Sequence, residues 1–161
     1  MIKKYFSAEQ AEGILLSLFG VISFSTSVVL SSQTKDPFYY GMSITLFLFS
    51  IVQIILGIVI IAKARNNKVK VKAYSTEKTE NMLIYEMPRV LKQITMNKIM
   101  VIVFFGFLVF ATIILFITID NISLKGLASG MLLQSILLII ALLYSNKRAE
   151  EYLQWIKHYF N

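Results

Sequence analysis

The sequence predicts an all-α integral membrane protein in which four transmembrane helices form two antiparallel hairpins, with both termini in the cytoplasm. The composition, four long apolar runs and a one-sided distribution of basic residues predict this class. Hydrophobic residues make up 57% of the 161 residues and charged residues only 16%, and the mean hydropathy is +0.69. Soluble domains are about 45–50% apolar and about 25% charged. The composition therefore excludes a water-soluble globule, and the length leaves room for one membrane domain, residues 1–161.

Four apolar runs without charged residues are long enough to cross a bilayer, because about 20 residues at 1.5 Å per residue span a hydrocarbon core of about 30 Å. These runs are residues 14–30, 41–62, 99–119 and 127–144. A basic linker at residues 63–98 separates the second run from the third, and a tail at residues 145–161 follows the fourth. The first run is longer than a typical signal-peptide core and leads directly into the second, so we expect a permanent helix there.

Basic residues lie almost entirely on one side of these runs. Lys and Arg accumulate in the short cytoplasmic segments of membrane proteins. Fourteen of the sixteen Lys and Arg residues precede the first run or lie in the linker or the tail, and only Lys35 and Lys125 lie in the other two connections. We therefore expect both termini in the cytoplasm. The abundance of Lys, Ile and Asn favours a bacterial cytoplasmic (inner) membrane.

The helices of the first hairpin have recognisable start signals. Ser7 and Gln10 fit a capping box, in which each side chain binds a free backbone N–H group of the first turn. Asp36 followed by Pro37 is typical of an N-cap and a first-turn proline. We expect the first helix to begin near Ser7 and the second near Asp36.

Small residues predict how these two helices pack. They recur every seven residues, at Gly13, Gly20 and Ser27 in the first run and at Ser43, Ser50 and Gly57 in the second. In an antiparallel pair, residues at equal depth have position numbers with a constant sum, which is 70 for all three pairs. Small residues let helices approach closely in lipid, and a seven-residue repeat favours a left-handed crossing. The same register places Ser17 opposite Gln53, and we expect these two side chains to hydrogen-bond.

The second hairpin has a less regular pattern. Gly126 and Gly130 form a G-x-x-x-G pair in the fourth run, a motif that permits close helix packing. We expect this face to contact the third run or another subunit. The pairs expected from a register sum near 246 are Ala111 with Ser135 and Thr112 with Gln134.

The first part of the linker is strongly basic. Lysine alternates with valine from Lys68 to Lys72, as in a strand, but a lone strand has no pairing partner. We expect an extended segment in which Lys68, Lys70 and Lys72 contact anionic lipid headgroups or an acidic partner, since each Lys contributes roughly 1 kcal/mol to binding such a surface. A role in orientation alone would also explain these charges.

Helical structure is expected on both sides of Pro88 and in the tail. From Ser75 the composition favours a helix that ends near Met87, and after Pro88 the residues Val90, Leu91 and Ile94 suit an amphipathic lead-in that continues into the third span. The tail carries an apolar stripe on a cytoplasmic extension of the fourth helix. The stripe consists of Tyr152, Trp155, Ile156 and Tyr159. Its partner is either the bilayer surface or the lead-in.

Catalytic chemistry has little support in the sequence. Cysteine is absent and His158 is the only histidine, so His158 lacks the fellow ligands or the nucleophile that a functional histidine needs. Phosphate-binding loops and nucleophile motifs are also missing. We expect no catalytic residue, metal or cofactor. We also expect no nucleic acid partner, because the linker contains few of the aromatic residues on which bases stack.

These observations favour a non-enzymatic small membrane protein that recognises itself or another membrane protein through its helix faces, as an accessory, regulatory or immunity-type subunit does. The alternative is an oligomeric small channel or transporter in which Gln53 and Gln134 line the path with nearby serines. A lipid enzyme comes third, and Glu12 and Glu86 are the carboxylates that it would use. Glu12 is either a first-turn acid favoured by the helix dipole or an ionisable group at the mouth of a pathway.

Overall fold

The computed structural model describes residues 1–33, 35–77, 82–117 and 120–160. Its elements are α1 (Ile2–Gln33), α2 (Pro37–Glu77), the short π-helix η1 (Met82–Glu86), α4 (Met87–Ile117) and α5 (Ile122–Phe160). Each of the four long helices is long and apolar enough to cross a membrane, which confirms the predicted all-helical class and its four candidate spans.

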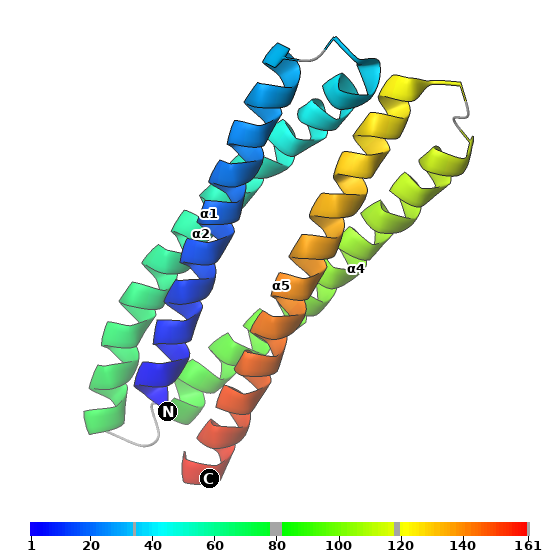
Figure 1. The fold of residues 1–161 in the computed structure, drawn as a ribbon. Helices are drawn as coiled ribbons and strands as arrows, with labels where there is room; N and C mark the ends of the chain where they lie inside the picture. The colour runs from blue at the N-terminus through cyan, green and yellow to red at the C-terminus, as the bar shows by residue number, and fades with distance from the viewer. Residues whose placement is uncertain (34, 78–81, 118–119, 161) are drawn as a thin grey trace.

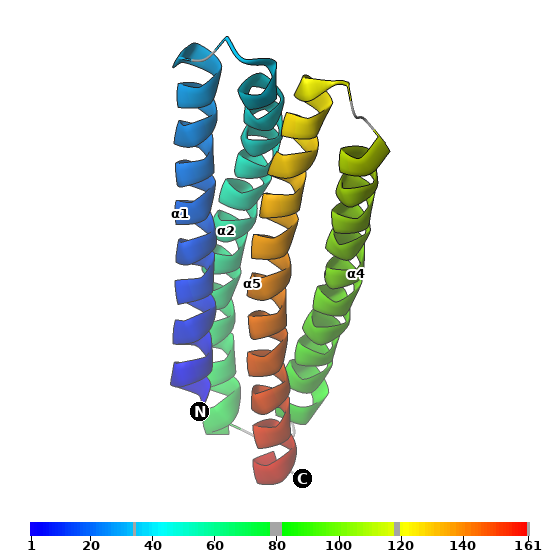
Figure 2. The same ribbon diagram turned by 45° about the vertical axis from the view of Figure 1, so that its right-hand side comes forward.

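The four long helices lie side by side in one bundle (Figures 1 and 2). The helix α1 packs along α2, α4 packs along α5, and α2 and α5 pack against each other. Contact between α1 and α5 is much more limited. Both chain termini lie at the same end of the bundle (Figure 1), so the polar residues near the two ends of the chain are brought together there.

The helix α1 begins at Ile2, one and a half turns before the start expected at Ser7. The capping-box prediction was wrong because tertiary contacts hold the preceding turn. Tyr5 and Phe6 are 2% and 0% exposed and belong to a cluster formed by all the long helices. Their burial stabilises helical structure upstream of Ser7, whose own side chain is exposed.

The helix α2 continues without interruption through residues 63–77, so the expectation of an extended segment at Lys68 to Lys72 was also wrong. Ala64 and Val71 are seven residues apart on one helix face, and both are buried in the same cluster as Tyr5 and Phe6. At 1.5 Å per residue, the 41 residues of α2 span about 60 Å, about twice the thickness of a hydrocarbon core. The burial of Ala64 and Val71 in this cluster therefore stabilises a helix where the alternation of lysine and valine had suggested an extended segment.

The lead-in and the third span form a single helix. The π-helix η1 ends at Glu86, and α4 runs from Met87 to Ile117. Pro88 is the second residue of α4, where the missing N–H group of proline breaks no intrahelical hydrogen bond. Val90 and Ile94 of the lead-in are buried, whereas Leu91 is 43% exposed.

A cluster of buried hydrophobic residues lies at the end of the bundle that holds both termini. Tyr152 and Ile156 of α5 are fully buried there, against Tyr5, Phe6 and the lead-in of α4. The remaining members are Ala64, Val71, Val90, Ile94, Ala149 and Leu153. The apolar stripe of the tail therefore packs inside the bundle, against the first turns of α1 and the lead-in of α4. The side chain of Tyr159 is outside the described residues.

Candidate functional site

The small residues of α1 and α2 meet along one line, which we call the α1–α2 seam. A side-chain carbon added at Gly13 would lie 2.8 Å from the carbonyl oxygen of Gly57, and one at Gly20 would lie 3.0 Å from that of Ser50. The hydroxyl of Ser27 donates a hydrogen bond to the carbonyl oxygen of Ser43 at 2.9 Å. The structure thus brings together the three residue pairs whose position numbers add to 70.

The expected hydrogen bond between Ser17 and Gln53 is absent. The Ser17 hydroxyl is buried against Gly57 and has no hydrogen-bond partner among the described residues. Gln53 instead donates through Nε2 to Oε1 of Gln134 at 2.6 Å, and Gln134 donates through Nε2 to the Ser23 hydroxyl at 2.9 Å. Gln53 lies at the expected depth, but its side chain is directed at α5, where the amide oxygen of Gln134 accepts its hydrogen bond; the Gln53 Oε1 atom has no partner among the described residues.

The Gln53–Gln134–Ser23 chain, which we call the amide chain, joins α2, α5 and α1 inside the bundle. Gln53 and Gln134 are each 1% exposed. The expected pairing of Thr112 with Gln134 is wrong, because Gln134 faces the first two helices and the Thr112 hydroxyl donates to the carbonyl of Leu108 within α4. Polar side chains in hydrocarbon bind one another across helices, so the amide chain fixes how the two hairpins fit together.

The face formed by Gly126 and Gly130 contacts α2. A side-chain carbon at Gly126 would lie 1.8 Å from the carbonyl oxygen of Phe38, and one at Gly130 would lie 3.1 Å from Cβ of Thr45. On the facing helix, a carbon at Gly41 would lie 2.0 Å from the Ser123 carbonyl oxygen. The expectation that this face packs on the third run or on another subunit was therefore wrong. The matching small residue on α2 is Gly41, but a single glycine does not show in the sequence which helix it faces.

Ionic side chains lie around the buried cluster at the end of the bundle with the termini. Arg148 of α5 donates to Glu12 of α1, and its guanidinium lies over the Tyr5 ring, 5.6 Å from the ring centre. Arg89 of α4 binds Glu86 through two hydrogen bonds of 2.6 and 2.8 Å. Each carboxylate that a lipid enzyme would use is therefore held by an arginine.

Other polar groups complete this end of the bundle. Arg89 lies over the ring of Phe6, 5.3 Å from its centre, and the Tyr5 hydroxyl donates to Gln93 at 3.0 Å. Glu9 is 6% exposed and precedes the apolar run 14–30 by about one turn. Burial raises the pKa of the Glu9 carboxyl, and the nearby charges of Arg89 and Arg148 oppose that shift.

Comparison of the chain with models of protein families, with curated proteins and with solved structures finds no match.

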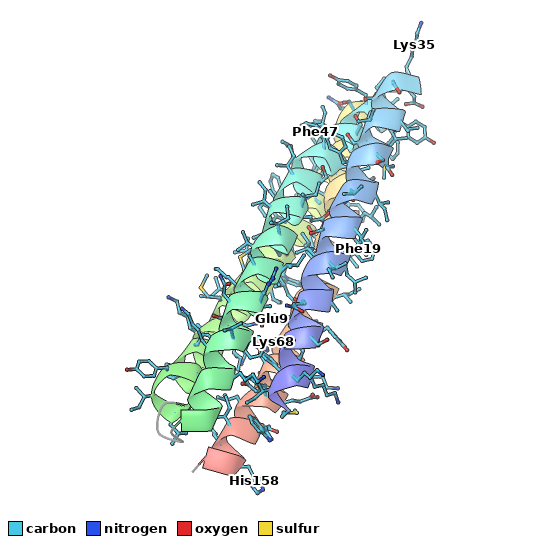
Figure 3. All side chains as sticks on the ribbon, turned by 90° about the vertical axis from the view of Figure 1, so that its left-hand side faces the viewer. Glu9, Phe19, Lys35, Phe47, Lys68 and His158 are labelled. Atoms are coloured by element: carbon cyan, nitrogen blue, oxygen red, sulfur yellow. The ribbon has the colours of Figure 1, made fainter. Side chains whose placement is uncertain are left out.

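The lysines singled out in the linker lie on the last turns of α2. Lys70 and Lys72 are exposed and Lys68 is half-buried, while Val71 between them faces the buried cluster. Figure 3 shows Lys68 near the end of the bundle that also holds Glu9 and His158, whereas Lys35 lies at the opposite end. The lysines therefore line an outer surface of α2.

Gly106 differs from every other glycine in the chain. A side-chain carbon added at Gly106 would have no heavy atom of the described residues within 4 Å. Gly106 lies on the exposed face of α4, between Ile102 at 70% exposure and Phe110 at 55% exposure. Sequence reasoning missed this position, because a lone glycine in an apolar run has no periodic partner that would draw attention to it.

Proposed function

We propose that this chain is a non-enzymatic membrane protein that binds a transmembrane helix, of a second copy or of another membrane protein, on the exposed face of α4 around Gly106. An accessory, regulatory or immunity-type subunit would act in this way. The face with Gly126 and Gly130 is covered by α2. The surface that binds the partner is therefore assigned to α4.

The distribution of glycines supports this assignment. At six positions a side-chain carbon would lie no more than 3.1 Å from an atom of a neighbouring helix, so a side chain at any of them would crowd that helix. These positions are Gly13, Gly20, Gly41, Gly57, Gly126 and Gly130. A glycine inside a helix is about 1 kcal/mol less favourable than alanine. Among the described residues, none packs on Gly106 closely enough to offset this cost, and a close external helix would do so.

The surroundings of Gly106 suit such a contact. Only 11% of the most apolar stretch of α4 is buried, compared with 28% in α2 and 33% in α5. Figure 2 shows α4 at one side of the bundle, beside α5. Small residues mark the places where helix backbones approach in lipid, and the flanking Ile102 and Phe110 would pack around the incoming helix.

Topology and location form part of the proposal. Both termini lie at one end of the bundle, with Lys35 at the other (Figures 1 and 3). Most basic residues belong to the first of these ends, and basic residues favour the cytoplasmic side. We infer that this end is cytoplasmic, in a bacterial inner membrane.

The amide chain weakens the channel alternative. Gln53 and Gln134 are almost completely buried and bind each other, whereas side chains that line a path need access to the solute. Their arrangement favours a role in holding the hairpins together.

The proposal is tested with Gly106→Leu. This change adds four carbon atoms to a position with open space, so the bundle is expected to fold normally while the complex isolated gently from native membranes is lost. Val52→Phe adds the same number of carbon atoms to a 48% exposed position on α2 and serves as the matched control. The measurements are the mass of the tagged complex and the proteins that purify with it. A self-associated complex identifies the partner as a second copy, and a foreign protein identifies a heterologous partner.

The proposal is wrong if Gly106→Leu leaves the complex intact. It is also wrong if both variants disrupt the complex equally, because added bulk in lipid would then explain the loss. Helicity measured in the same detergent shows that each variant is folded.

A further inference from the structure

A pocket lies between the first turns of α1 and the inner part of α5, separate from the exposed face of α4. Its lining residues are Met1, Lys4, Tyr5, Ala8, Tyr144, Lys147, Arg148 and Glu151. Its volume is about 260 Å³. We propose that this pocket binds the phosphate group of an anionic phospholipid.

The charges in the pocket favour an anion. Lys4 from α1 and Lys147 from α5 converge on it with Arg148, while Glu151 is the only acidic residue among the described residues of the lining. Arg148 is already paired with Glu12, but neither lysine forms an ion pair with another described residue. Two ammonium groups without a carboxylate partner, presented by different helices, leave room for the negative charge of a phosphate.

The position of the pocket matches the depth of lipid headgroups. Tyr144 ends the apolar run 127–144, and Arg148 follows one helical turn later. Glu12, which binds Arg148, comes directly before Gly13 and the first apolar run. The ion pair therefore lies at the boundary of the apolar layer, and the pocket opens just beyond it. Tyrosine is enriched at this level of membrane proteins.

Apolar surface leads from the pocket toward the bilayer. Tyr144 is 69% exposed, and Ile140, one turn earlier in α5, is 59% exposed. On α1, Leu15 follows Ala8 by two turns on the same face and is 55% exposed. An acyl chain could follow either surface while its phosphate stays between Lys4 and Lys147. A free phosphate ion would gain nothing from these apolar contacts, so the surroundings favour a lipid as the source of the phosphate.

The test uses the full chain in mild detergent, mixed with phosphatidylglycerol or with zwitterionic phosphatidylcholine, with the retained lipid counted by native mass spectrometry. We expect retention of phosphatidylglycerol and little retention of phosphatidylcholine. The variant Lys4→Gln with Lys147→Gln is expected to retain phosphatidylglycerol about thirtyfold less, because two lysines are removed from an anionic contact.

The matched control is Lys3→Gln with Lys157→Gln. It removes the same charge from the same two helices at exposed residues outside the pocket, and we expect it to behave like the unmodified chain. Equal loss in the two double variants would mean that net charge controls retention and would overturn the assignment. Displacement of the lipid by inorganic phosphate would identify a free-phosphate site and would overturn the lipid as the source. Equal retention of the two lipids would overturn the requirement for an anion.

Discussion

Individual polar residues determine how the two hairpins are joined. Gln134 binds Gln53 on α2 and Ser23 on α1, while Glu12 and Arg148 pair across 136 positions of the sequence. In an apolar surrounding, a polar group without a partner is unfavourable. Residues that are distant in the sequence are therefore coupled through a few specific contacts.

Substitution of the amide chain tests this coupling. Gln53→Leu and Gln134→Leu each leave the other amide without its partner, whereas the double variant removes both. We expect the double variant to be more stable than the sum of the single effects predicts, by about 0.6 to 1.7 kcal/mol, which are the average and the largest values measured for hydrogen bonds between membrane helices. The measurement is a double-mutant cycle of unfolding free energies in mixed micelles. Strict additivity would show that the two side chains do not interact in the folded bundle.

Whole elements extend well beyond the apolar runs. The helices α2 and α5 contain 41 and 39 residues, about twice what a bilayer requires. Their extra turns are held by the buried cluster that includes Val71 and Tyr152. The alternation of lysine and valine could not reveal this, because a period of two over five residues does not exclude a helix when a packed surface is available for one of the valines.

The helical extension of α2 is tested with a pair of valines. Val71 is 1% exposed and Val69 is 69% exposed. Val71→Asp places a charge in the buried cluster and is expected to destabilise the fold by about 3 kcal/mol or more. Val69→Asp is expected to change the unfolding free energy by only about 0.5 kcal/mol, as for most surface positions. Denaturation followed by circular dichroism measures both, and similar effects would indicate an extended segment instead of a helix.

The buried cluster and most of the ionic side chains gather at the end of the bundle that holds both termini. The bundle is held along the α1–α2 seam, by the α2–α5 contact and by the cluster near the termini, while α4 packs mainly on α5. This asymmetry leaves one side of the bundle available for another helix. The proposed lipid pocket lies elsewhere, between α1 and α5.

The orientation of the whole molecule is measurable because the chain contains no cysteine. Lys35→Cys and His158→Cys each introduce a single thiol at one end of the bundle, as Figure 3 shows for the two positions. A membrane-impermeant maleimide is expected to label Lys35→Cys in intact cells and His158→Cys only after permeabilisation. Labelling of His158→Cys in intact cells would reverse the proposed topology.

The sequence by itself determined the class of the protein and the residues of the α1–α2 seam. Apolar runs and a seven-residue repeat are local properties, so Gly13, Gly20 and Ser27 could be matched with their partners by position number alone. The tertiary structure decided which partner each remaining contact residue takes. Gly126 packs on α2 and Gln53 binds Gln134. Both contacts join α2 to α5, two segments that are far apart in the sequence. Local patterns carry no record of such contacts, which are selected by how well whole helix surfaces fit together.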